Sequence, residues 1–298
     1  MFRLRLVLAA IVCVLFWALV GAVLGGLFRH PLGGFVCGLL LGSIYAVACS
    51  WAAPKFPGDV WDAKLLENIN APKLYEMLHT LSDRTGLALP TLYYTPSLDP
   101  NAFATAGRDG ETAIVVTSGL TRSLEKDEVQ AVMALMMARL ATGAMPAWTT
   151  AATLAGVPVS VGQSWLRRPG FALPGKLLLT LTAFPAAALT RLVWDEKIVT
   201  ASDYHAAHLT ESAGSLARAL QKMEAGLTRD GADAGNPATV LLFAVPPLPP
   251  LAAGTSDPLW QRGLQAIPFP MPNAAARAAR FAEVVPSYEE APEEFRIY

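Results

Sequence analysis

Two of the four histidines of this 298-residue chain lie close together in the sequence, next to an aspartate. Asp203, His205 and His208 read D-x-H-x-x-H, and on a helix the spacing of the two histidines could place both on one face near a metal ion. A metal held there could activate a water molecule for hydrolysis. The opposite interpretation, in which both histidines lie on a helix surface facing solvent, stays open.

Other catalytic arrangements find no support in the residues. Cys13, Cys37 and Cys49 lie inside apolar runs without a partner base, so we expect them to act as small apolar packing residues. Ser118-Gly119 lacks the G-x-S-x-G setting of a nucleophile elbow, and no glycine-rich phosphate loop is present. The net charge of −1 gives no indication of a nucleic-acid partner.

The chain is poor in charged residues and rich in apolar ones, with 16% charged and 53% hydrophobic. Soluble domains carry about 25% charged residues. Residues 6–28 and residues 31–54 contain no charged side chain, and each run is long enough to span a bilayer as a helix. We therefore expect residues 1–55 to form a transmembrane hairpin. Arg3 and Arg5 precede the first apolar run, and Lys55, Lys64 and Lys73 follow the second, so the positive-inside rule predicts that both flanks lie in the cytoplasm.

A second apolar block follows in the middle of the chain, at residues 141–190. Residues 141–166 are uncharged, and Lys176 is the one charge between residues 171 and 190. If both halves cross the bilayer, Arg167 and Arg168 lie outside the cytoplasm, against the positive-inside rule. The block is therefore either a second transmembrane hairpin or a re-entrant one, and the chain has two to four transmembrane helices.

The segments between and after the apolar blocks, residues 56–140 and 191–230, carry alternating helix and strand patterns. The expected elements are helices over residues 71–84, 123–140, 195–227 and 274–284 and strands over residues 91–95, 102–106 and 111–117. Prolines interrupt regular structure beyond residue 231, so residues 231–298 are expected to be a Pro-rich region with an acidic tail.

This order of elements resembles the HtpX-like family of membrane zinc metalloproteases, relatives of the CAAX prenyl proteases. The sharpest match is P-N-A-F-A-T at residues 100–105, with Gly107-Arg108 close behind, which is similar to the family's P-N-A-F-A-x-G-R segment with one extra residue. Residues 203–210 resemble the family's A-D-x-x-A-A-x-L-T stretch. Pro272 and Arg277 lie where the family has H-P-P-x-x-x-R, with Met271 in place of the histidine. The resemblance implies a mainly α integral membrane protein with an α+β zincin-like, metalloprotease-like domain.

The resemblance also implies a zinc site that this chain does not reproduce. In the family, H-E-x-x-H supplies two zinc ligands and the general base, and a later glutamate supplies the third ligand. The corresponding residues here are Leu135, Met136, Arg139 and Val199. Leucine and valine have no lone pair, methionine cannot act as a base, and arginine is a fixed positive charge. The residues thus predict no intact catalytic group and no cofactor, although the family resemblance implies zinc.

Two structural hypotheses follow from the resemblance. With the histidines gone, we expect Arg139 to form an ion pair with Asp203 in the position of the metal. The strand expected over residues 111–117 and the N-A-F-A-T segment at residues 101–105 resemble the wall of the family's substrate groove, where an extended peptide can be held by strand addition. The residues expected to line this groove are Asn101, Phe103, Thr105, Val115 and Thr117.

The favoured interpretation is an inactive pseudoprotease of the bacterial inner membrane, with its soluble parts in the cytoplasm. It would bind or regulate membrane proteins or a partner protease in membrane protein quality control, with the lipid bilayer around its hairpins. The alternative is an active membrane metalloendopeptidase with a relocated or unrecognised site, such as Asp203, His205 and His208. A third interpretation is a membrane scaffold whose groove is filled by its own side chains, for example Met133, Met136 and Met137.

Overall fold

The protein begins with two long apolar helices, and its structure is a computed structural model that describes residues 2–107, 109–227, 236–247 and 271–282. Helices α1 (Phe2–Leu27) and α2 (Pro31–Ala52) form a hairpin that turns at Arg29, whose φ is 64°. A Cβ atom on Gly34 of α2 would collide with the backbone of Gly21 and Gly25 of α1. Small residues therefore let the two helices approach closely, as in other membrane helix pairs.

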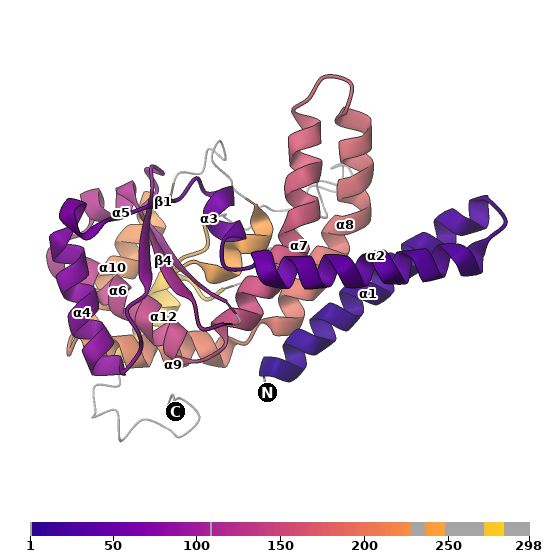
Figure 1. The fold of residues 1–298 in the computed structure, drawn as a ribbon. Helices are drawn as coiled ribbons and strands as arrows, with labels where there is room; N and C mark the ends of the chain where they lie inside the picture. Colours follow the sequence, from indigo (N-terminus) through magenta and orange to yellow (C-terminus); the bar gives the residue numbers. More distant parts are fainter. Residues whose placement is uncertain (1, 108, 228–235, 248–270, 283–298) are drawn as a thin grey trace.

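Among the described residues, three helices are long and apolar enough to cross a membrane: α1, α2 and α8 (Ala172–Val193). Helices α6 (Lys126–Ala141) and α7 (Met145–Leu166) would add a fourth span if they count as one helix bent by 92°. Helices α7 and α8 pack together as a second hairpin, which leaves the rest of the molecule in a different direction from the α1–α2 hairpin (Figure 1).

Within the described part of the chain, the soluble region contains a four-stranded mixed sheet. Its strands are β1 (Lys64–Leu65), β2 (Thr91–Thr95), β3 (Ala102–Ala106) and β4 (Thr112–Thr117), in the order β1-β2-β4-β3. Strands β2 and β4 are parallel, whereas β1 and β3 each pair antiparallel with their neighbour. Strand β3 therefore ends the ladder on one side, and it contains residues 102–105 of the sequence motif.

Helix α6 is the central helix of the soluble part. It is buried along almost its whole length and packs against β3 and helices α4, α9 and α10. The remaining elements surround it and the sheet, namely α3 (Phe56–Val60), η1 (Asn68–Asn70), α4 (Pro72–Thr85), α5 (Ser118–Ser123), α9 (Glu196–Leu209), α10 (Ala213–Gly226), η2 (Pro237–Leu242) and α12 (Ala274–Ala282).

The expected fold class is confirmed: a mainly helical membrane protein with a small mixed sheet in its soluble part. The prediction of a single helix over residues 195–227 is wrong, because helix α9 ends at Leu209 and a separate helix, α10, begins at Ala213. Glu211 there adopts a positive φ of 53°, and Ser212 caps the new helix α10. Helices α3 and α5 and strand β1 were not predicted. The acidic tail, residues 287–298, and most of the Pro-rich region lie outside the described residues.

Candidate functional site

Helix α6 starts with a capping box that fixes its first turn. The side chain of Glu125 accepts a hydrogen bond from the third helical residue, and Glu128 Oε2 accepts the Glu125 backbone N–H at 2.9 Å. Lys222 Nζ of α10 also donates to Glu128 Oε2 at 2.8 Å. Burial raises the pKa of Glu128, but these hydrogen bonds lower it more, so it lies below the usual value. The charged carboxylate thus joins the start of α6 to α10.

The four positions expected to correspond to the zinc site come from two packed helices. Leu135, Met136 and Arg139 lie on α6 and Val199 lies on α9, and all four are almost completely buried. Leu135 and Arg139 are four residues apart and so share a helix face. These side chains offer no imidazole, carboxylate or thiolate, which are the ligands that zinc takes in proteins. The donor set at these positions therefore does not fit a zinc ion.

Arg139 is fully buried and binds backbone carbonyl groups. Its Nη1 donates to the carbonyl oxygen of Phe243 at 2.5 Å and to that of Leu242 at 3.3 Å. Its Nε and Nη2 have no hydrogen-bond partner among the described residues. Burial lowers the pKa of Arg139 to about 9, and the positive charge of Arg277 contributes to this. The guanidinium is still protonated at neutral pH, so a positive charge stands at this position.

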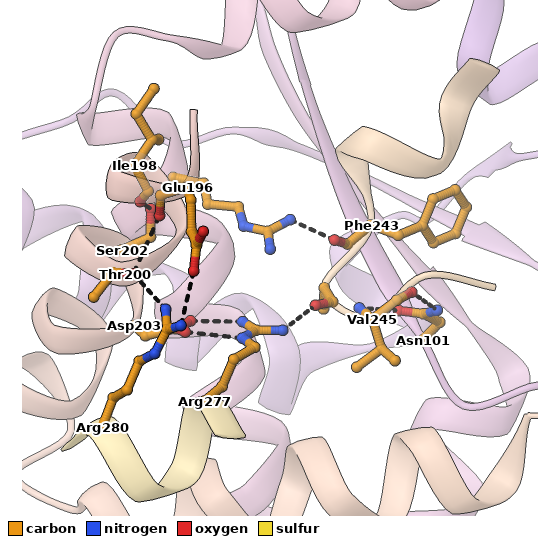
Figure 2. A network of polar contacts seen from close by, with 12 residues as sticks. Asn101, Glu196, Ile198, Thr200, Ser202, Asp203, Phe243, Val245, Arg277 and Arg280 are labelled. Carbon is orange, nitrogen blue, oxygen red and sulfur yellow. Dashed lines mark hydrogen bonds and ion pairs between the residues drawn. The ribbon is translucent and has the colours of Figure 1, made fainter. Parts of the chain in front are cut away.

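Asp203 forms its ion pair with Arg277 of α12. Arg277 Nε donates to Asp203 Oδ2 at 2.8 Å and Nη2 donates to Oδ1 at 2.6 Å, and both side chains are buried (Figure 2). The expected ion pair between Arg139 and Asp203 is therefore wrong: within the described residues the two form none, because Arg277 engages both carboxylate oxygens. The sequence signal for Arg277 was its place in the H-P-P-x-x-x-R resemblance, but nothing there indicated its partner.

The five residues expected to line a groove serve three different purposes. Asn101 and Phe103 contact residues 243–245 of the chain itself. Thr117 caps helix α5 by accepting the Leu120 N–H at 3.1 Å. Thr105 and Val115 line a cavity of about 560 Å³ that also borders α3, β2 and Glu111. The structure thus does not unite them in one open groove.

The D-x-H-x-x-H residues do not assemble into a metal site. Across the part of the chain that the structure describes, no three His, Cys, Asp or Glu side chains lie close enough to share a metal ion. Asp203 has both oxygens bound by Arg277. Burial lowers the pKa of His205, with a smaller lowering from His208, so His205 is neutral near pH 7.

Comparison with known proteins places these features in a family. The model of peptidase family M48 matches residues 68–279. The Protease HtpX homolog of Syntrophobacter fumaroxidans is 30% identical over 261 residues, covering 83% of this chain and 90% of its own length. That of Acaryochloris marina is 31% identical, covering 76% of this chain and 78% of its own. No solved structure matches the chain.

These comparisons correct the expectation that the chain has no cofactor. Peptidase family M48 consists of zinc metalloproteases, so zinc is the cofactor to expect, and the prediction of none is wrong on this finding. In this chain, however, the side chains at the four positions that correspond to the family's zinc site do not fit a zinc ion. Because the family model spans most of the sequence and HtpX relatives align along most of their own length, the chain belongs to peptidase family M48 as a membrane protein of the HtpX type.

Proposed function

We propose that this protein is a catalytically inactive member of family M48, a pseudoprotease held in the membrane. The observation that carries the proposal is the use made of Arg139. The position expected to hold the second zinc-binding histidine carries a buried cation that binds the carbonyl oxygens of Leu242 and Phe243. A fixed positive charge repels a dication, and its donor nitrogen is already engaged by the backbone.

The other three positions support the same conclusion. Met136, at the position of the general base, has a thioether that cannot accept a proton from water at any accessible pH. Leu135 and Val199 belong to the apolar core around α6, and their exposure is 0% and 1%. Loss of one ligand can leave a weak metal site, but loss of the ligands together with the base leaves no metal-hydrolase mechanism at this place.

We further propose that the protein acts by binding in the bilayer, to membrane proteins or to a partner protease, as a part of membrane protein quality control. The anchoring hairpins and the protease-like domain are both retained, whereas the catalytic side chains are replaced. Arg5 Nη1 of α1 forms an ion pair with Asp195 Oδ2 at 3.0 Å, next to α9. This contact supports an orientation with the domain on the side of the N-terminus, which the positive-inside rule assigns to the cytoplasm of a bacterial inner membrane.

The experiment is a proteolysis assay on the full chain purified in detergent, with and without added zinc and chelator. Casein and an unfolded membrane protein serve as substrates, and a purified HtpX-type protease with an intact H-E-x-x-H serves as the positive control. We expect no cleavage above background and no effect of the chelator. Chelator-sensitive cleavage, together with about one zinc ion per chain by elemental analysis, would overturn the proposal and favour the relocated metal site.

A further inference from the structure

Residues 242–245 follow directly from η2, whose last residue is Leu242, and pair with the outer edge of strand β3; we call this segment the strap. Phe103 and Phe243 form an antiparallel bridge, and the Ala244 N–H donates to the Ala102 carbonyl oxygen at 2.8 Å. Strand β3 is one of the two edge strands of the described sheet, and at five residues it is the longer one, so it is the edge that offers an extended peptide more backbone groups to pair with. The chain thus fills its own peptide-binding edge.

Side chains hold all four strap carbonyl groups. The donors are Arg139 to residues 242 and 243, Arg277 to residue 244 at 2.6 Å, and Asn101 to residue 245 at 2.7 Å. Figure 2 shows the Arg277 and Asn101 side chains directed toward this segment from opposite sides. The Val245 N–H in turn donates to Asn101 Oδ1 at 3.3 Å. The strap is therefore recognised through its backbone, which is how a sheet edge recognises a bound peptide.

The side chain of Phe243 in the strap also packs into an apolar site. The ring of Phe243 lies 4.6 Å from that of Phe103 and 4.9 Å from that of Trp61, measured between ring centroids. Phe243 is 1% exposed, as expected for a side chain filling a specificity pocket beside a sheet edge. The backbone contacts and this pocket together resemble the two parts of peptide recognition by strand addition.

The electrostatics couple the strap to Arg139. Two buried guanidinium groups, those of Arg139 and Arg277, face one buried carboxylate, that of Asp203. Asp203 is engaged by Arg277, so the described partners of Arg139 are the carbonyl oxygens of the strap. A buried charge without dipoles around it is costly, so Arg139 and the strap stabilise each other.

We infer that Arg139 fastens the strap into the β3 edge as an internal ligand, so that the peptide-binding edge is closed in the resting protein. The residue at the position of a zinc-binding histidine has become the anchor of this closure. An extended segment of another polypeptide can pair with β3 only after the strap leaves. This inference rests on the proposed function, because an anchor and a zinc ligand exclude each other at residue 139.

The test is hydrogen–deuterium exchange of the full chain in detergent, followed by mass spectrometry of fragments covering residues 240–247. In the wild type the strap amides should exchange as slowly as those of β4. Arg139→Met removes the anchor and should speed exchange of the strap amides about tenfold or more while leaving β2 and β4 unchanged. Arg139→Lys keeps a charged donor and should restore most of the protection.

Arg84→Met is the matched control, because Arg84 Nη1 also donates to a backbone carbonyl, that of Leu209 at 2.6 Å, away from the strap. It should leave strap exchange unchanged. Strap exchange in the wild type at the rate of an exposed loop would overturn the inference even if Arg139→Met fails to fold. Unchanged strap exchange in a folded Arg139→Met protein would overturn it too, while an absence of proteolysis would leave the proposed function standing. Chelator-sensitive proteolysis with the expected exchange pattern would overturn the proposed function and keep the strap.

Discussion

Arg277 and Asp203 form a bidentate ion pair in the interior, with donor–acceptor distances of 2.8 and 2.6 Å, between helices that lie far apart in the sequence. The same guanidinium donates its remaining arm to the Ala244 carbonyl oxygen. One side chain thus connects α9, α12 and the strap. Because Arg277 binds both carboxylate oxygens of Asp203, the guanidinium of Arg139 donates instead to the carbonyl oxygens of residues 242 and 243.

Removing Arg277 should destabilise the soluble part strongly. Arg277→Met leaves the Asp203 carboxylate buried without a partner, and breaking a buried pair in this way costs about 3–5 kcal/mol. Arg280 on the same helix is the control, because its ion pair with Glu196 at 2.8 Å is about half exposed, and Arg280→Met should cost less than about 1 kcal/mol. Denaturant titration in detergent measures both, and equal effects would contradict the buried role of Arg277.

Glu128 should give the protein a stability that is lost in acid. Its pKa in the folded protein lies below the usual value, so its contribution is complete above the unfolded pKa of about 4.3 and disappears as the pH falls through the folded pKa. Glu128→Gln should therefore be less stable than the wild type at pH 7, by about 1–2 kcal/mol, and the two should converge once the pH has fallen below the lowered pKa of Glu128 in the folded protein. Glu76→Gln, at an exposed position of α4, controls for the change in net charge.

Local signals predicted the elements that position the site. The helices predicted over residues 71–84 and 123–140 correspond to α4 and α6, and Gly86, with a φ of 67°, ends α4 just beyond the predicted range. The strands at residues 91–95 and 102–106 were predicted to the residue from their strand patterns. Such signals involve residues close together in the sequence, so a single sequence is enough to recognise them.

The partners of Arg139 could not be predicted in this way. Its acceptors lie 103 and 104 residues further along the chain, in a segment without helix or strand periodicity. Arg277 lies 74 residues from Asp203, and only the docking of α12 against α9 brings the two together. Charge complementarity alone left Arg139 and Arg277 equivalent as partners of Asp203, and tertiary packing decided between them.

Close packing in the N-terminal hairpin should depend on one of two adjacent glycines. A side chain at Gly34 would meet the backbone of α1, whereas at Gly33 the nearest atom is the His30 Cβ at 4.0 Å. Gly34→Leu should therefore separate the helices and lower the thermal unfolding midpoint in detergent. We expect it to reduce the free energy of unfolding by about 1–3 kcal/mol. Gly33→Leu should have little effect, and a similar loss from both would show that the helices do not pack through this face.

Restoring the four catalytic positions should create a zinc site if the correspondence to the family motif is right. The variant Leu135→His, Met136→Glu, Arg139→His and Val199→Glu supplies two histidines on one face of α6 and a carboxylate from α9, and it removes the strap anchor at the same time. The new polar groups are buried, so zinc should raise the thermal unfolding midpoint of this variant and bind at about one ion per chain. The matched control carries the first histidine at Met137 in place of Leu135, while Met136→Glu, Arg139→His and Val199→Glu are kept; Met137 is equally buried and lies on a different face of the helix. Zinc binding by the control as strong as by the variant would refute the assignment of these positions, as would a folded variant that binds none.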